Sequence, residues 1–321
     1  MSSKLYTLTK NTFIETIRQP IYMVLIIAAL ILFFLSPSIT MYTMDEDIKL
    51  LREIGLSTLL LTSLFIAIFA ASGSVADEIE NKTITTVLSK PIQRPIFILS
   101  KFLGVGGAVL MAHYICTIAL LMAVRHGVLE SVNDTHDWTV IAAGLISLAA
   151  AFILSAFFNY VYDWKFTSTA VFLMAIFGTI SIIFLYFIDR DLKFAPKNNG
   201  LHTFDVYASI LLFMAGLVIA AIAVALSTRF NIVVTLTSCI GIFLLGLVTD
   251  YAFGELAHKQ LWAKACYFVV PNLQIFWVSD AIYEGSKIPI SYVFSIGSYS
   301  LCYAAAILFL AIAIFQRRQI G

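Results

Sequence analysis

Long runs of apolar residues, separated by short polar stretches, repeat along this chain of 321 residues. A bilayer core about 30 Å thick is crossed by about 20 apolar residues in helical form, and a helix satisfies its own backbone hydrogen bonds there. Eight runs have this length and contain no Asp, Glu, Lys or Arg: 21–42, 54–76, 102–124, 138–162, 169–188, 206–228, 231–249 and 290–315. The pattern predicts an all-α polytopic membrane protein with about eight transmembrane helices.

Two connections between these runs are very short. Residues 163–165 join the fourth run to the fifth, and Arg229 and Phe230 join the sixth to the seventh, so each pair is expected to form a tight hairpin. Before the first run, residues 3–19 have one apolar and one polar face in helical form, which is typical of a helix lying in the membrane interface. The alternative is a solvated leader. We expect an interfacial helix over 1–20 and a single transmembrane domain over 21–321.

The composition agrees with a membrane protein and excludes several other classes. Apolar residues make up 60% of the chain and charged residues 12%, whereas soluble domains have about 45–50% and about 25%. The net charge of +1 gives no support to nucleic-acid binding. The four cysteines show no CxxC spacing, so we expect neither a metal site nor a disulfide framework. No P-loop motif occurs, no catalytic residue stands out, and we expect no enzyme activity and no cofactor bound by this chain.

The positive charges indicate how the chain is oriented. With an even number of spans both termini lie on one side, and that side holds eleven Lys and Arg against nine on the other. Since cytoplasmic segments carry the excess of Lys and Arg, we place both termini in the cytoplasm.

The segment between the second and third runs carries the most informative motif. Ile84, Val87 and Leu88 form a small apolar face at helical spacing, Asn81 is suited to cap the helix, and Pro91 ends it. The pattern predicts a short cytoplasmic helix over 80–90. An apolar face without a core of its own is buried either on lipid headgroups or in a partner protein.

The residue pattern of this segment also resembles a known family. Its motif consists of Glu80, Thr83, Ile84, Leu88, Ser89, Pro91 and Arg94. This motif is similar to the coupling-helix region of ABC-2 type transporter permeases, especially the NosY-like membrane subunit. The opening run from Asn11 to Pro20 and the basic end Arg317-Arg318 are similar to that family's termini. The family typically has six spans, whereas eight are predicted here.

The resemblance implies a function and a set of partners. It implies the membrane-spanning permease subunit of an ABC transporter that exports its substrate across a bacterial inner (plasma) membrane. A separate ATPase (nucleotide-binding) subunit would bind ATP and Mg²⁺, and the permease would pair with a second copy or a sister permease. The implied contacts with the ATPase are Glu80, Asn81, Thr83, Ile84, Val87, Leu88, Ser89, Pro91 and Arg94.

Residues 251–289 form a long segment before the last run. Within it, 268–277 is too short to span and ends in the aromatic pair Phe276-Trp277, while Pro271 interrupts it. We expect a re-entrant or interfacial element on the outer side. The resemblance implies an outer gate formed by Pro271, Phe276 and Trp277, and the alternative is a simple interface anchor.

Two features inside the apolar runs are better explained by helix packing than by a catalytic or ligand-binding role. His113 has no acidic partner in any run, so we expect a histidine hydrogen-bonded to a neighbouring helix and not a proton relay. Gly104, Gly106 and Gly107 lie within an apolar run with no preceding strand, which favours close helix packing over phosphate binding. Two other functions stay open: a non-transporting membrane scaffold, and an ion-coupled secondary transporter, which usually needs charged residues within its spans. The substrate is not identified.

Overall fold

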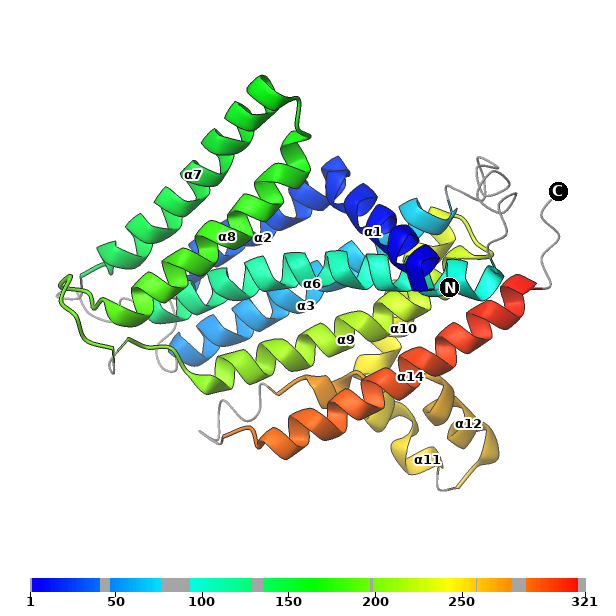
Figure 1. Cartoon of the computed structure of the whole chain (residues 1–321). Coiled ribbons are helices and arrows are strands. Elements are labelled where there is room, and N and C mark those ends of the chain that lie inside the picture. Colours follow the sequence, from blue (N-terminus) through cyan, green and yellow to red (C-terminus); the bar gives the residue numbers. More distant parts are fainter. Residues whose placement is uncertain are drawn as a thin grey trace.

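The chain is described by a computed structural model over residues 2–40, 47–76, 93–128, 135–196, 199–257, 259–278 and 287–316. Within these ranges the residues form helices, turns and loops, and the only β-pairing is an isolated bridge between Ile188 and Phe194. Figure 1 shows an elongated bundle of helices.

Seven helices of this described part are long and apolar enough to cross a membrane, which confirms an all-α polytopic membrane architecture. They are α2 (Pro20–Thr40), α3 (Asp47–Ala71, continued by the π-helix η1, Ser72–Ala76), α6 (Arg94–His126), α7 (Trp138–Tyr162), α8 (Phe166–Phe187), α9 (Thr203–Ser227) and α14 (Ile290–Gln316). The expected hairpin of α7 and α8 is present, and Asp163 ends α7 in the left-handed conformation with φ 55°.

The predicted eighth span differs from the other seven. Residues 231–249 correspond to α10 (Ile232–Leu247), whose 16 residues at about 1.5 Å each reach about 24 Å. This is shorter than a bilayer core of about 30 Å, so the count of eight full-length spans is not confirmed. Beyond α10 the helix is distorted into the π-helix η2 (Asp250–Gly254), and the short helices α11 (Glu255–Ala257) and α12 (Leu261–Val269) follow. In Figure 1, α10 crosses behind α9 and α14 at a steep angle.

Helix α1 and the C-terminal end of α14 lie on one side of the bundle. The last turn of α14, the α7–α8 turn and all of α1 (Ser2–Arg18) lie along the upper right of Figure 1, whereas the starts of α3, α7, α9 and α14 lie along its lower left. Since α9 ends on the first side and α14 starts on the second, the chain makes its remaining passage between Ser227 and Ile290. Within the described residues, α10 to α12 and the irregular stretch after α12 contribute to that passage, in place of one straight helix. Which side faces the cytoplasm stays a prediction.

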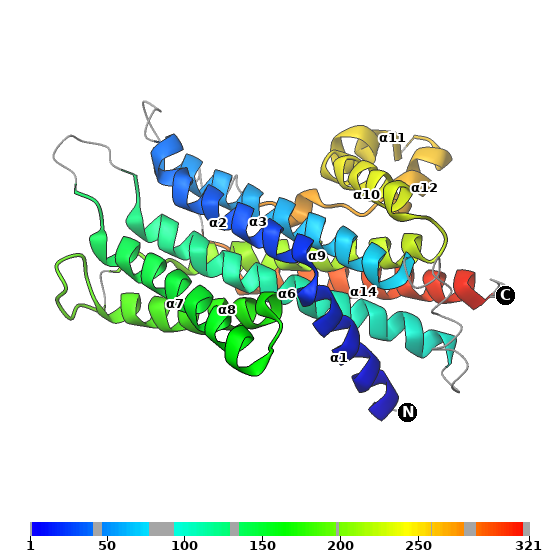
Figure 2. The ribbon, with the colours of Figure 1, turned by 90° about the horizontal axis from the view of Figure 1, so that it is seen from above.

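The most buried helices are α3 and α9, and α7 is the most exposed of the seven. Figure 2 shows the α7–α8 hairpin on one flank and α10 to α12 on the opposite flank, with α6 and α9 between them. Small residues allow the central helices to approach closely. A Cβ atom added to Gly216 of α9 would lie 3.2 Å from the Cβ atom of Ser63 on α3.

The predicted N-terminal helix is α1, which lies across α6. A Cβ atom on Gly104 would lie 2.6 Å from the Cβ atom of Thr12, and one on Gly107 would lie 3.3 Å from the ring of Phe13. These two glycines therefore serve helix packing, as the sequence predicts. The placement of α1 in a membrane interface stays a prediction.

Charged side chains occur near the helix ends, because several helices extend beyond the predicted apolar runs. Arg52 of α3 pairs with Asp205 of α9 at 2.9 Å, and Asp205 is almost completely buried. Arg125 of α6 lies 3.5 Å from Asp137, the N-cap residue of α7, and both side chains are buried. The absence of charge predicted for the spans therefore holds only for their apolar middle parts.

Candidate functional site

Most residues expected to contact an ATPase lie outside the described residues. These are Glu80, Asn81, Thr83, Ile84, Val87, Leu88, Ser89 and Pro91. Arg94 is described, and it is the first residue of α6. Its Nη1 atom donates hydrogen bonds to the carbonyl oxygens of Phe315, at 3.1 Å, and Gln316, at 2.6 Å. Arg94 therefore joins the start of α6, next to the predicted coupling segment, to the end of α14.

A second arginine reaches the same helix end. The Nη2 atom of Arg229, in the turn between α9 and α10, donates a hydrogen bond of 3.0 Å to the carbonyl oxygen of Ile314. The last four carbonyl groups of a helix have no partner within the helix, and positive charge is favoured beside them. The C-terminal turn of α14 is thus fixed to two other parts of the bundle.

The residues of the expected outer gate lie in an irregular stretch between α12 and α14. Pro271 and Phe276 are buried and Trp277 is half-buried; Phe276 belongs to the single 3₁₀ turn η3 (Gln274–Phe276). Pro271, Leu273 and Phe276 are buried against neighbouring helices. Phe268 and Val269, by contrast, are 72% and 73% exposed.

Three tyrosines of α14 bind the backbone of this irregular stretch. The hydroxyl of Tyr303 donates to the carbonyl oxygen of Val269 at 2.6 Å, and that of Tyr292 donates to the carbonyl oxygen of Ile275 at 2.6 Å. Between them, the backbone N–H of Asn272 donates to the hydroxyl oxygen of Tyr299 at 3.1 Å.

These hydrogen bonds show in which direction the stretch runs and beside which part of α14 it lies. As its residue numbers rise, those of the tyrosines fall, so it runs antiparallel to α14, from the middle of that helix to its N-terminal end. Non-helical backbone at membrane depth requires polar partners from the protein. The tyrosine hydroxyls of α14 supply such partners.

The end of α10 packs against the same stretch. The backbone N–H of Leu273 donates to the carbonyl oxygen of Gly246 at 2.9 Å. A Cβ atom on Gly246 would lie 2.7 Å from the carbonyl oxygen of Pro271 and 2.9 Å from Leu273, closer than side chains approach. Only glycine permits this contact without a shift of the backbone.

A polar cluster anchors the π-helix that follows α10. The Asp250 carboxylate accepts hydrogen bonds from the hydroxyl of Tyr267, at 2.8 Å, and from the side-chain amide of Asn272, at 2.9 Å. One carboxylate therefore ties η2, α12 and the irregular stretch together.

His113 lies at the centre of the bundle and is hydrogen-bonded to two neighbouring helices. Its Nε2 atom lies 2.9 Å from the carbonyl oxygen of Ser209 on α9, and its Nδ1 atom lies 2.8 Å from the hydroxyl oxygen of Ser63 on α3. Because a carbonyl oxygen only accepts, Nε2 carries the proton in the neutral ring and Nδ1 accepts from Ser63. The predicted hydrogen bonds to neighbouring helices are present.

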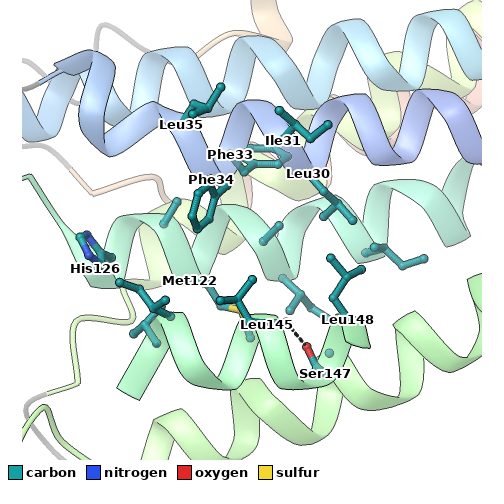
Figure 3. Close-up of a pocket in the computed structure, with 18 of the residues that line it drawn as sticks. Leu30, Ile31, Phe33, Phe34, Leu35, Met122, His126, Leu145, Ser147 and Leu148 are labelled. Atoms are coloured by element: carbon teal, nitrogen blue, oxygen red, sulfur yellow. Dashed lines mark hydrogen bonds between the residues drawn. The ribbon is translucent and has the colours of Figure 1, made fainter. Parts of the chain in front are cut away.

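A cavity of about 420 Å³ lies between α2, α6, α7 and α8. This is within the range of about 300–1,000 Å³ that is usual for small-molecule sites. Figure 3 shows side chains of α2, such as Phe34 and Leu35, across from Leu145 and Leu148 of α7, with Met122 of α6 between them. The walls are almost entirely apolar.

Two histidines lie at one end of the cavity. His126, at the end of α6, and His136, just before α7, line it there, with ring centroids 5.6 Å apart. This is the side of the bundle opposite the termini, where α6 ends and α7 begins (Figure 1). The cavity thus has a mostly apolar lining, with two imidazole rings at one end and the hydroxyl of Ser147, which donates to the carbonyl oxygen of Gly144, further along it.

The sequence did not predict this cavity or the two ion pairs. The four charged residues of these pairs lie at the ends of apolar runs on the same predicted side: Arg52, Arg125, Asp137 and Asp205. This arrangement of opposite charges was the sequence feature that could have indicated ion pairs. Which helix ends would meet was not visible in that signal. Among the residues that the structure describes, no group of three or more His, Cys, Asp or Glu side chains is arranged to hold a metal ion.

Comparisons with other proteins add no identification. The chain matches no family model, no curated protein and no solved structure.

Proposed function

We propose that this chain is the membrane-spanning permease subunit of an ATP-driven transporter of the ABC-2 type. A separate ATPase subunit would bind ATP and Mg²⁺ and would contact residues 80–90. The motif from Glu80 to Arg94 carries the proposal, and its last residue, Arg94, is hydrogen-bonded to the end of α14. Two copies of the chain, or one copy and a sister permease, would assemble with two ATPase subunits in a bacterial plasma membrane.

The length and position of the segment support this assignment. Residues 77–93 separate the end of η1 from the start of α6, whereas helix–helix connections in bundles usually have about 2–8 residues. A long connection with an apolar helical face, on the side of the termini, is suited to docking on a partner. The absence of Asp, Glu, Lys and Arg from the middles of the spans disfavours an ion-coupled transporter.

The contacts of α14 suggest how movement at the ATPase would reach the opposite side. Arg94 ties the C-terminal turn of α14 to the start of α6, and Tyr292, Tyr299 and Tyr303 tie its N-terminal half to the irregular stretch. A shift of α6 would therefore move α14 and change the packing of Pro271 and the residues after it. In this proposal the stretch is the outer gate.

The test is association with the ATPase. Replacing Leu88 with Asp places a charge in the proposed apolar contact, at a cost of about 2–5 kcal/mol in binding. We expect copurification with the ATPase and ATP-dependent transport to fall, while the permease still inserts. Leu192→Asp is the matched control, because Leu192 is exposed on the side opposite the termini.

Each outcome has a defined meaning. Loss with Leu88→Asp and not with Leu192→Asp supports the proposal. Unchanged association with Leu88→Asp contradicts the coupling role of residues 80–90. Copurification of the unmodified chain with partners that include no ATPase would favour a non-transporting scaffold.

A further inference from the structure

The cavity between α2 and α7 is open to the surroundings of the bundle. Its lining residues Ile31, Phe34 and Leu145 are 52%, 63% and 53% exposed, so both walls continue onto the outer surface of the protein. For a bundle of membrane-spanning helices, that surface faces hydrocarbon. An apolar space of this size, open to a bilayer, is filled from the bilayer, because interiors of proteins are close-packed and keep few voids.

The end of the cavity that holds the two histidines lies at the level of lipid headgroups. Trp138, the first residue of α7, is exposed, and its ring lies 5.8 Å from that of His136. Exposed tryptophans at the ends of spans are typical of the headgroup region. A ligand that follows the cavity therefore has its chain beside Leu145 and Leu148 and its head beside the two histidines.

Donor groups at this end are suited to phosphate. The Nη2 atom of Arg190 donates to the carbonyl oxygen of His126 at 3.2 Å, and its Nε atom lies 3.6 Å from the Asp137 carboxylate. A guanidinium has five N–H donors, so others stay open, and 54% of this side chain is exposed. The Nδ1 atom of His126 donates to the carbonyl oxygen of Gly127, so Nε2 of the neutral ring is an acceptor, and the donors for a phosphate at this end come from Arg190. Guanidinium groups bind phosphate oxygens with charge-assisted hydrogen bonds.

We propose that this cavity binds one acyl chain of a bilayer phospholipid, which enters sideways between α2 and α7, with its phosphate beside Arg190, His126 and His136. Lipid tails are as apolar as the cavity walls, so the chain gains little by leaving the bilayer. Preference for a phospholipid over other lipids then arises from the contacts of the phosphate. The site does not depend on an ATPase partner, so the test of the site is independent of the test of the proposed function.

Photochemical labelling of the full-length protein tests this site. The protein is placed in nanodiscs of dioleoyl phosphatidylcholine with a trace of phosphatidylcholine or diacylglycerol, each carrying a diazirine in one acyl chain. We expect labelled peptides from α2 and α7 to exceed those from the exposed face of α14. We also expect the phosphatidylcholine probe to label α2 and α7 several-fold more than the diacylglycerol probe.

Two glycines give a matched pair of variants. Gly144 of α7 lines the cavity, and a Cβ atom added there would meet only the Sδ atom of Met122, at a contact distance of 3.9 Å, so Gly144→Phe adds a ring to the lining. On α10, Gly241 has no atom within 4 Å of an added Cβ, and Gly241→Phe makes the same change outside the cavity. Ser147→Phe is a second filling variant, used if Gly144→Phe is not monodisperse.

The expected results separate a site from ordinary lipid contact. Filling the cavity should reduce labelling of α2 several-fold, and Gly241→Phe should not. Arg190→Gln should abolish the preference for phosphatidylcholine over diacylglycerol and keep the chain labelling. Equal labelling of all exposed helices, unchanged by Gly144→Phe and Ser147→Phe, would overturn the proposal. Specific labelling of α2 and α7 by both probes equally would overturn the phosphate part of it.

Discussion

The guanidinium of Arg94 lies 5.8 Å from the ring centroid of Phe315 and donates a hydrogen bond to the carbonyl oxygen of the same residue, 221 positions later in the chain. On its other side the Phe315 ring is stacked on Phe97, with centroids 5.6 Å apart. The start of α6 and the end of α14 are therefore held together in two ways. Arg94 binds the carbonyl groups of Phe315 and Gln316, and the rings of Phe97 and Phe315 are stacked.

Loss of this arginine should weaken the end of α14. Arg94→Met keeps an apolar stem over Phe315 but removes both hydrogen bonds, and we expect a loss of about 1–2 kcal/mol in the free energy of unfolding. The measurement is thermal unfolding of the purified protein in detergent. Arg18→Met is the control, because Arg18 lies exposed at the end of α1. Equal losses in the two variants would contradict a specific role for Arg94.

The tyrosines of α14 should determine whether the irregular stretch stays in place. Tyr303→Phe leaves the carbonyl oxygen of Val269 without its hydroxyl donor, and Tyr299→Phe leaves the N–H of Asn272 without its acceptor. We expect each variant to cost about 1–3 kcal/mol and to speed hydrogen exchange in residues 270–276. Tyr160→Phe, at an exposed position of α7, should change neither quantity. Faster exchange spread over the whole chain would indicate general destabilisation and not a local release.

Asp137 has two separable roles. One carboxylate oxygen caps α7 by accepting from the backbone N–H groups of Thr139 and Val140, at 3.1 and 3.2 Å, and the other faces Arg125. Asp137→Asn keeps a capping oxygen but leaves the buried Arg125 without its counter-charge, which should cost about 3–5 kcal/mol. Asp137→Ala should cost about 1 kcal/mol more, because the cap is lost as well.

A double variant checks this assignment. Arg125→Met combined with Asp137→Asn removes the two buried charges and leaves the half-exposed Arg190, and it should recover part of the stability lost in Asp137→Asn, as measured by thermal unfolding. Asp163→Asn, at the opposite end of α7, should be close to neutral, because asparagine tolerates the left-handed conformation found there. If the double variant is less stable than both single variants, the charge pair is not what Asp137 contributes.

The orientation of the bundle can be measured with single cysteines in a cysteine-free background. Lys193, between α8 and α9, and Arg229, between α9 and α10, are exposed at opposite ends of α9. With cytoplasmic termini, Lys193→Cys should react with an impermeant thiol reagent in intact cells, and Arg229→Cys only after permeabilisation. The reverse pattern would invert the orientation, and reaction of both in intact cells would contradict their placement on opposite sides.

Local features of the fold were predicted well from the sequence. Gly104 and Gly107 pack against α1, and His113 is bonded to α3 and α9, because a small residue or a lone polar group inside an apolar run has few physically acceptable environments. The hairpin at Asp163 likewise followed from a connection too short for any other arrangement. By contrast, residues 80–91 lie outside the described part, so the proposed ATPase contacts stay predictions.

The sequence by itself determined that this chain is a bundle of membrane-spanning helices, since an apolar helix satisfies its own backbone and depends little on what lies beside it. Only the tertiary structure decided where groups distant in the chain would meet. Asp205 pairs with Arg52, which lies 153 positions earlier in the chain. Tyr303 donates to the carbonyl group of Val269, in a stretch whose apolar pattern alone was compatible with a gate or an anchor. The cavity between α2 and α7 is of the same kind, because the space between helices depends on their tilt and on the side chains facing it, and no single run of residues specifies either.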